Sequence, residues 1–282
     1  MQRERVSENV YWFQSEIYAQ VTAGVVLGSD WAVVIDTLAI PEETLAMRSF
    51  VEEELKVPVR YVINTHYHAD HTWGNCFFPG ATVVSSALCR SLMIERGIPA
   101  LEETRHANPT FKQVKMVLPH LTFETGTMSL TVGKKRLILF PTPGNSPDGI
   151  SVLIEEDRVL FAGDAFMPIP YIVDGDYDQL CETMKHVGLM GLENIVQGHG
   201  DIILRGEIEG TVEDNLNYLQ EVYKAAKMAT RRRNPAEVLE QVDVQSCGKS
   251  RVYLEGLAEE LHQRNLRFLY LKIKADKAAS ES

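Results

Sequence analysis

The chain has 282 residues, of which 45% are hydrophobic and 24% are charged, and its formal net charge is −11 at pH 7. These values are typical of a globular protein with a sizeable core and exclude a largely disordered chain. The acidic balance argues against nucleic-acid binding, which needs clustered Lys and Arg. The exception is three arginines at 231–233, which follow a predicted helix and are expected to complement its dipole, with phosphate binding as the less favoured alternative.

The N-terminus and the cysteines indicate the cellular environment. Residues 1–9 contain no apolar run behind a basic start, and no stretch approaches the ~20 apolar residues of a membrane span. Four widely spaced cysteines form no Cys-x-x-Cys pair: Cys76, Cys89, Cys181 and Cys247. They predict reduced, mostly buried thiols, so a cytoplasmic protein is expected.

The first half alternates apolar segments with turn residues. Residues 11–38 predict two or three antiparallel strands, and Pro41 then begins a helix that Pro58 prevents from continuing. Residues 59–63 and 82–84 predict two further strands, and a helix over 86–96 is expected to stop at Gly97. Residues 98–120 contain three prolines and no clear periodicity, which predicts an irregular or loosely helical insertion of the kind that often serves as a lid.

The second half begins with four strand-like segments, at residues 128–132, 136–140, 150–154 and 158–162. A short strand is predicted at 194–196, and helices over 177–190, from Thr211 to about Lys227, and from Leu257 to about Lys274. Residues 275–282 are expected to fray. Strands followed by helices, twice over, predict two packed sheets with helices on their outer faces, in a single domain of residues 1–282.

Four metal-type donors follow the predicted strand at 59–63. They are His66, His68, Asp70 and His71, within six consecutive positions. On extended chain His66 and His68 can aim the same way, while Asp70 and His71 turn toward a second point. Neutral imidazole and carboxylate are ligands that borderline metals such as Zn²⁺ prefer. The cluster therefore predicts a metal site rather than a His-rich surface loop.

The segment from His66 to His71 resembles the H-x-H-x-D-H signature of the metallo-β-lactamase superfamily. Later segments resemble further landmarks of that family. Gly163-Asp164 is similar to the strand-end pair whose carboxylate bridges two metals, and Gly198-His199-Gly200 to the Gly-His-Gly of the last ligand. Thr142-Pro143-Gly144-Asn145 resembles the family's Thr-Pro-Gly-His turn, except that Asn145 stands in place of the ligand histidine.

This resemblance implies an α+β fold: the four-layer αβ/βα sandwich, in which two mixed sheets are flanked by outer helices and the site lies between the halves. It assigns ligands to two metals, with His66 and His68 on the first, Asp70, His71 and His199 on the second, and Asp164 as the bridge. By the same likeness, Asp36 is expected to hold the metal loop by hydrogen bonds. The expected cofactor is one or two Zn²⁺ ions, with iron or manganese as alternatives.

Asn145 leaves the state of the first metal site open. Its amide oxygen is a weaker, neutral ligand than imidazole. The first site would then bind metal through His66, His68, Asp164 and water, or stand empty most of the time, or the chain would have kept the scaffold and lost turnover. The first two outcomes are favoured because the other ligand positions are intact.

The resemblance implies a metal-dependent hydrolase that uses a metal-bound hydroxide to cleave a small ester, thioester or lactone-type acyl bond. Asp70 is the candidate catalytic residue, because it can steer the nucleophilic water or accept its proton. The segment Met167–Tyr171 is expected to wall the substrate pocket, while Trp73 and Tyr171 individually belong either to that wall or simply to the core. The alternative is a hydrolase-like binding or sensing scaffold with an impaired first metal site and little turnover.

The expected partner is a small-molecule substrate, with no nucleic acid and no membrane. The oligomeric state stays open, with a homodimer as one alternative.

Overall fold

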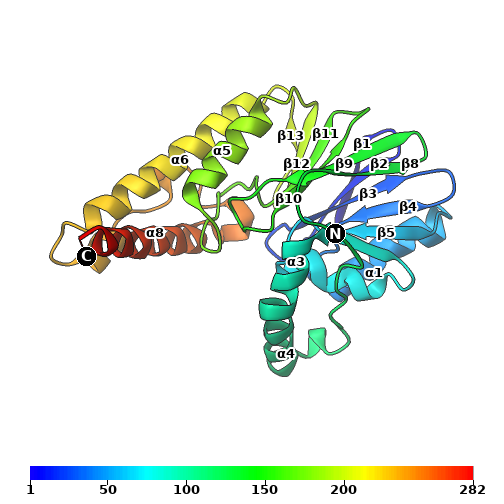
Figure 1. Cartoon of the computed structure of the whole chain (residues 1–282), viewed down its shortest axis with the longest axis horizontal. Coiled ribbons are helices and arrows are strands. Elements are labelled where there is room, and N and C mark those ends of the chain that lie inside the picture. The colour runs from blue at the N-terminus through cyan, green and yellow to red at the C-terminus, as the bar shows by residue number, and fades with distance from the viewer. Residues whose placement is uncertain (282) are drawn as a thin grey trace.

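Two mixed β-sheets pack face to face, and helices cover their outer sides (Figure 1). The computed structural model describes residues 1–281. Its architecture confirms the expected α+β sandwich of two mixed sheets flanked by helices. Within those residues, no helix is both long enough and apolar enough to cross a membrane.

The first sheet has the strand order β1-β2-β3-β4-β5-β6-β7. Its first four strands pair antiparallel, whereas β4 to β7 pair parallel. The edge strand β1 was not predicted, because its residues are polar and mostly exposed. The strands are β1 Gln2–Ser7, β2 Val10–Gln14, β3 Thr22–Leu27, β4 Ala32–Ile35, β5 Val59–Ile63, β6 Thr82–Ser86 and β7 Leu121–Phe123.

The second sheet has the order β13-β12-β11-β10-β9-β8. Only β11 and β12 pair parallel in it, and the other neighbours pair antiparallel. The strands are β8 Met128–Val132, β9 Lys135–Pro141, β10 Ile150–Ile154, β11 Val159–Gly163, β12 Asn194–Gln197 and β13 Ile203–Leu204. All four strands predicted between residues 128 and 162 are confirmed.

Strand β4 illustrates why the central strands are apolar on both faces. Val33 and Ile35 point into the core between the two sheets, whereas Ala32 and Val34 point into the core beneath the outer helix α1 (Pro41–Ser49). Successive side chains of a strand alternate in direction, so a strand covered on both sides needs an uninterrupted apolar run. The sandwich thus places the carboxyl ends of these buried strands in an apolar framework.

Helical structure after β6 runs past the point where it was expected to stop. The chain forms α3 (Ala87–Leu92), a π-helical turn (Met93–Gly97) and α4 (Ile98–Ala107) without a break. Gly97 takes a helical φ of −67°, so it does not provide the left-handed cap that ends many helices. Leu101 of α4 is buried with Phe111 and Trp73, and this packing stabilises the continued helix.

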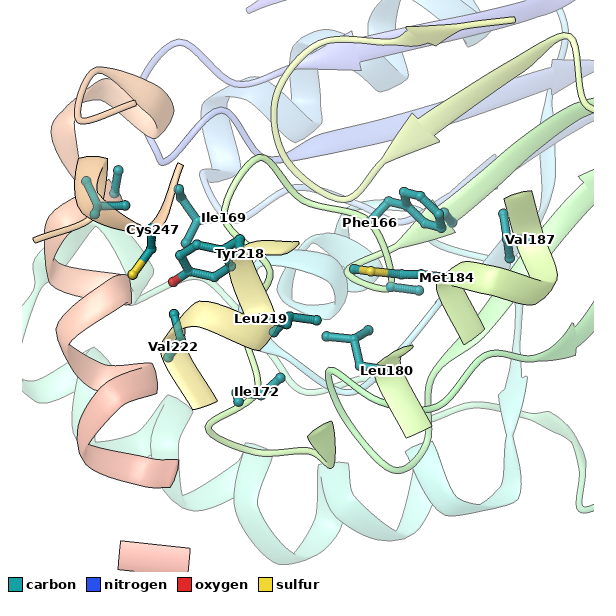
Figure 2. Packing of buried hydrophobic residues seen from close by; sticks show 14 of the residues in the cluster. Phe166, Ile169, Ile172, Leu180, Met184, Val187, Tyr218, Leu219, Val222 and Cys247 are labelled. Atoms are coloured by element: carbon teal, nitrogen blue, oxygen red, sulfur yellow. The ribbon is translucent and has the colours of Figure 1, made fainter. Parts of the chain in front are cut away.

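The C-terminal helices pack on the outer face of the second sheet. Figure 2 shows Leu180, Met184 and Val187 of one helix near Phe166, while Leu219 and Val222 of another lie near Ile172 in the same apolar cluster. In Figure 1, α6 and α8 extend side by side away from the sheets. The helices are α5 Tyr177–Gly188, α6 Ile208–Ala229, α7 Pro235–Glu240 and α8 Ala258–Glu281.

Two of these helices extend beyond their predicted bounds. Helix α6 begins at Ile208 rather than Thr211, because Ile208 is itself buried in the core and extends the helix by one turn. Helix α8 continues through Glu281, beyond the predicted end near Lys274, and Ser282 lies outside the described residues. The expected fraying of residues 275–282 stays a prediction. Lys272 bonds Asp176 at 2.6 Å, and Ile273 packs on the core, which anchors this end of the helix.

Candidate metal centre

Six metal-type side chains converge at the carboxyl ends of strands from both sheets. His66 and His68 follow β5, and the short helix α2 (Ala69–Thr72) carries Asp70 and His71. Asp164 follows β11, and His199 follows β12. The structure brings all six into two groups, in each of which the donor atoms lie within 4.8 Å of one another: His66, His68 and Asp164, and Asp70, His71 and His199.

Asp164 lies between the two groups and turns one carboxylate oxygen toward each. Its Oδ2 is 3.4 Å from Nε2 of His66 and 3.9 Å from Nδ1 of His68. Its Oδ1 is 3.2 Å from Nε2 of His71 and 3.6 Å from Nε2 of His199. Nε2 of His199 also lies 3.3 Å from Oδ2 of Asp70. A carboxylate placed in this way can share its oxygens between two neighbouring cations.

Two glycines allow the strand ends to meet at this point. Gly163 has a φ of +51°, in the left-handed region that favours glycine, and it redirects the chain so that Asp164 enters the centre. Gly198 passes directly behind Asp164, and a Cβ atom at Gly198 would lie 1.9 Å from Oδ1 of Asp164. The Gly-Asp and Gly-His pairs seen in the sequence therefore have a steric reason.

Asp36 holds the metal loop, as the sequence led us to expect. Its Oδ1 accepts a hydrogen bond from the backbone N–H of Thr65 at 2.8 Å, and its Oδ2 accepts from Thr65 Oγ1 at 2.7 Å. Nδ1 of His71 donates to the same Oδ2 at 2.8 Å, which leaves Nε2 of His71 as the atom that faces Asp164. A carboxylate behind an imidazole fixes the tautomer and the direction of the ring.

His199 is oriented by the opposite sheet. Its Nδ1 donates to the backbone carbonyl of Ala19 at 2.8 Å, so its Nε2 faces Asp70 and Asp164. A β-bridge between Val21 and His199 and a hydrogen bond from Thr22 N to Gly198 O at 2.8 Å join the start of β3 to this turn. Contacts between the two sheets thus position the last donor.

Asp174 supports His68, and sequence reasoning missed it. Its Oδ2 lies 3.4 Å from Nε2 of His68 and accepts a hydrogen bond from the hydroxyl of Tyr67 at 2.5 Å. Arg96 donates to Oδ1 of Asp174 at 2.6 Å. Because Asp174 is 106 residues from His68 in the chain, no local pattern could have linked them.

The electrostatics of the centre are dominated by buried carboxylates. Burial opposes the charge on Asp164, but His71, His199 and His66 outweigh it and hold the pKa of that carboxyl well below its usual range. Burial likewise disfavours the charged ring of His71, but Asp164 and the nearby Asp36 and Asp70 raise its pKa well above the ordinary value. The centre therefore needs positive charge, supplied by protons on the imidazoles or by a cation that displaces them.

Buried donor atoms without partners show that the residues fit a metal. Nε2 of His71 and Oδ1 of Asp164 are only 3.2 Å apart, yet neither makes a hydrogen bond to any residue in the described range 1–281. They are not aligned as donor and acceptor. Unpaired buried polar atoms destabilise the folded state. The imidazole nitrogen and the carboxylate oxygen lie next to each other as two ligands of one ion would.

Asn145 is turned partly away from the donors. Its Nδ2 donates to the backbone carbonyl of Tyr171 at 2.9 Å. Its Oδ1 is buried, has no hydrogen-bond partner among residues 1–281, and belongs to a residue that lines a cavity of only about 10 Å³ together with His66 and Asp164. The amide therefore adjoins the first group of donors, with one end used to hold the Tyr171 loop.

A larger cavity of about 300 Å³ opens above the two groups. His68, Asp70, Asp164 and His199 form part of its floor. Its remaining walls come from the segments around β3, after β11 and in the C-terminal region: Tyr18, Ala19, Met167, Tyr171, Leu254, Leu257, Glu260, Leu261 and Arg264. The volume is at the small end of the range for ligand-binding pockets.

The expected pocket walls are placed differently in part. Met167 and Tyr171 line the cavity as expected, whereas Trp73 packs against Phe111, with ring centroids 5.1 Å apart, and does not line it. Of the described residues, none from the segment 98–120 lines this cavity, and the roof comes instead from 254–264. The sequence offered one signal for that roof, since Leu257, Leu261 and Arg264 have the spacing of one helix face.

Comparison with known proteins agrees with this geometry. The profile of the metallo-beta-lactamase superfamily matches residues 18–207. The lactamase-like protein nscB of Trichophyton equinum is 25% identical over 184 residues, which cover 64% of this chain and 48% of that protein. The thioesterase pkgB of Emericella nidulans is 26% identical over 173 residues, which cover 61% of this chain and 43% of that protein. The match therefore spans about half the length of these curated relatives.

A solved structure supports the fold. A metallo-beta-lactamase from Pontibacter korlensis superposes with a TM-score of 0.63 at 21% sequence identity, over 78% of this chain and 98% of that protein. Identity this low establishes the architecture and leaves the substrate undecided. The profile match over two thirds of the sequence, the sandwich of two mixed sheets and the convergent His and Asp side chains lead to one conclusion: the chain belongs to the metallo-β-lactamase superfamily.

Proposed function

We propose that this protein is a metal-dependent hydrolase that cleaves a small ester, thioester or lactone-type acyl bond. The observation that carries the proposal is the convergence of six donors, four of which form part of the floor of a largely apolar cavity. One relative of comparable identity is named a thioesterase, which supports acyl-bond cleavage as the reaction class. Among the described residues that line the cavity, Arg264 is the only Lys or Arg, which argues against a phosphate-rich substrate.

The residues of this chain would hold and orient the reacting groups. His66, His68 and Asp164 would hold one ion, and His71 and His199 a second, with Asp164 between them. Bound there, one or two ions, zinc foremost, would supply Lewis acidity and lower the pKa of a coordinated water.

Asp70 lines the cavity and lies 3.3 Å from His199, so it can bind an ion or accept a proton from the attacking water. In the hydrolysis, the water oxygen forms a bond to the acyl carbon and the acyl C–O or C–S bond breaks. The leaving alcohol or thiol takes up a proton.

The test combines metal content with a substrate panel. Elemental analysis of the purified protein would give the identity and the equivalents of metal per chain. Chromogenic esters, thioesters, lactones and phosphodiesters would then be assayed with and without chelator. We expect chelator-sensitive hydrolysis of acyl substrates that Asp164→Ala and His199→Ala abolish. Hydrolysis that survives both substitutions, or a preference for phosphodiesters, would overturn the proposal.

A second candidate function is a binding or sensing scaffold with little turnover, and Asn145 favours it. Asn145 stands where the family signature provides an imidazole, so the first donor group lacks that ligand. The amide nitrogen of Asn145 instead donates to the carbonyl of Tyr171. The variant Asn145→His separates the two candidates. If the first site is weakened but functional, this substitution raises metal occupancy and acyl hydrolysis together. A scaffold would gain metal without gaining turnover, and unchanged occupancy would refute this account of Asn145.

A further inference from the structure

The roof of the cavity comes from the C-terminal segment, outside residues 18–207 that match the family profile. Leu254, Leu257 and Leu261 make this roof apolar, and Arg264 adds one guanidinium group. Leu257, Leu261 and Arg264 are spaced by four and three residues, so they lie along one face of the helical segment above the donors. These three side chains give the cavity a wall that the residues matching the family profile do not provide.

Helix α8 is held against the cavity wall by Asn265. The Nδ2 of Asn265 donates to the carbonyl of Pro170 at 2.7 Å, and its Oδ1 accepts from the N–H of Ile172 at 3.0 Å. These two bonds clamp the chain on either side of Tyr171, which lines the cavity. Because Asn265 is fully buried, the helix backbone at the neighbouring Arg264 is fixed beside Tyr171, while the Arg264 side chain itself is 55% exposed.

The guanidinium of Arg264 keeps donors available for a ligand. It donates to Glu260, one helical turn earlier, and Tyr171 and Glu260 raise its pKa, so it is permanently charged. A guanidinium has five N–H donors in a planar fork, and the pair with Glu260 uses only part of them. An isolated i,i+4 ion pair between two exposed side chains adds little to helix stability, so the pair with Glu260 gives little structural reason for an arginine at this cavity wall.

The charge balance of the cavity indicates what this arginine recognises. Its other charged walls are Asp70, Asp164 and Glu260, and the whole chain carries −11. These carboxylates would repel an anionic substrate unless a cationic side chain faces the substrate's negative charge. We propose, on the basis of the acyl-hydrolase function above, that Arg264 is a specificity-determining residue that binds a carboxylate at the far end of the substrate's acyl chain, so that half-thioesters of dicarboxylic acids are preferred.

The apolar roof is consistent with such a substrate. Leu254, Leu257 and Leu261 would cover the methylene groups between the reacting carbonyl and the terminal carboxylate. Planar carboxylate and guanidinium groups bond in a bidentate manner, which adds orientation to affinity. The preferred substrate class is then set by α8 and not by the metal centre.

The test compares two substrates that differ only in charge at the far end. A glutaryl thioester and its monomethyl ester would be assayed with the full-length, metal-loaded protein, and kcat/KM would be determined for each. We expect the wild type to favour the free carboxylate by about tenfold, the gain typical of one charge-assisted contact. Arg264→Met should remove this preference through a higher KM for the glutaryl substrate, and Arg264→Lys should restore part of it.

A control on the same helix separates recognition from folding. Arg267 is exposed and lies beside a different surface pocket, so Arg267→Met removes the same charge from α8 without touching the cavity. It should leave both kcat/KM values within twofold of wild type. Equal hydrolysis of both substrates by the wild type, or an equal loss for both in Arg264→Met, would overturn the role of Arg264. Absence of hydrolysis of either substrate would instead count against the proposed function itself.

Discussion

Replacing Gly198 by alanine tests the bridging position of Asp164 without removing any donor. The added Cβ would lie 1.9 Å from Oδ1 of Asp164 and 2.9 Å from its backbone N, against an ordinary contact of at least 3.4 Å. The carboxylate would therefore have to move by about 1.5 Å, and Oδ1 would leave its place 3.2 Å from His71. Loss of a group that only hydrogen-bonds a metal ligand typically lowers metal affinity ten- to hundredfold, and displacement of a ligand itself should cost at least as much.

The assay is competition for metal against a chromophoric chelator, with bound metal counted per chain. We expect Gly198→Ala to weaken binding about tenfold or more and to lower the free energy of unfolding by about 1–3 kcal/mol through overpacking. Gly210→Ala is the matched control, because a Cβ at Gly210 in α6 meets nothing within 4 Å. Alanine should stabilise that helix by about 0.5–1 kcal/mol and leave metal binding unchanged.

The result that would refute this reasoning is a folded Gly198→Ala protein that binds metal as tightly as the wild type. Near-UV circular dichroism would establish that its tertiary packing is intact. If the variant does not fold, Asp164→Asn provides the same test with unchanged volume. The amide removes the charge that His71 and His199 face, so metal affinity should fall with it.

Three further predictions follow from buried polar groups. Asp36→Asn should lower metal affinity about 10–100-fold, measured by the same competition. The carboxylate accepts with both oxygens, from the Thr65 N–H on one and from Thr65 Oγ1 and His71 on the other, whereas the NH2 group of an amide cannot accept. Unchanged affinity would exclude a supporting role. Burial lowers the pKa of Lys249 to about 8 from 10.5, so between these pH values the unfolded chain binds one proton more than the folded chain. The free energy of unfolding should therefore rise by roughly 3 kcal/mol from pH 8 to 10.5, measured by urea titration relative to a Lys249→Met variant. Parallel pH curves for the two proteins would contradict this. Chelator should lower Tm, and zinc added in excess should restore it in a concentration-dependent manner, whereas a Tm insensitive to metal would show that no ion is bound to the folded chain.

The donors and the strands that carry them could be predicted because both are local features. Apolar runs such as residues 59–63 predict buried strands, and the H-x-H-x-D-H segment after that run identifies imidazoles at a strand end. Element ends were less predictable. Gly97 fitted a helix stop, yet the helix continues because Leu101 is buried beyond it. Packing outweighed the local signal there.

The supporting residues and the cavity roof depend on contacts between distant parts of the chain. Asp174 meets His68 across 106 residues, and the Ala19 carbonyl meets His199 across 180. Neither contact leaves a periodic pattern, because each partner sits in a loop whose position is set by the sheets. The 98–120 segment looked like a lid from its prolines, whereas residues 254–264 form the roof.

The amino-acid sequence alone determined which side chains are available for metal chemistry and in what order the strands present them. Residue type, and the repeat of apolar residues every two positions in strands or about every 3.6 in helices, are properties of neighbouring positions. They can therefore be recognised in the sequence without a structure. Only the tertiary structure decided that Asp164 turns an oxygen to each group, that Asn145 holds the Tyr171 carbonyl, and that Arg264 reaches the cavity. Those features arise at the contacts between the two sheets and the C-terminal helix, and these contacts depend on how the whole chain packs.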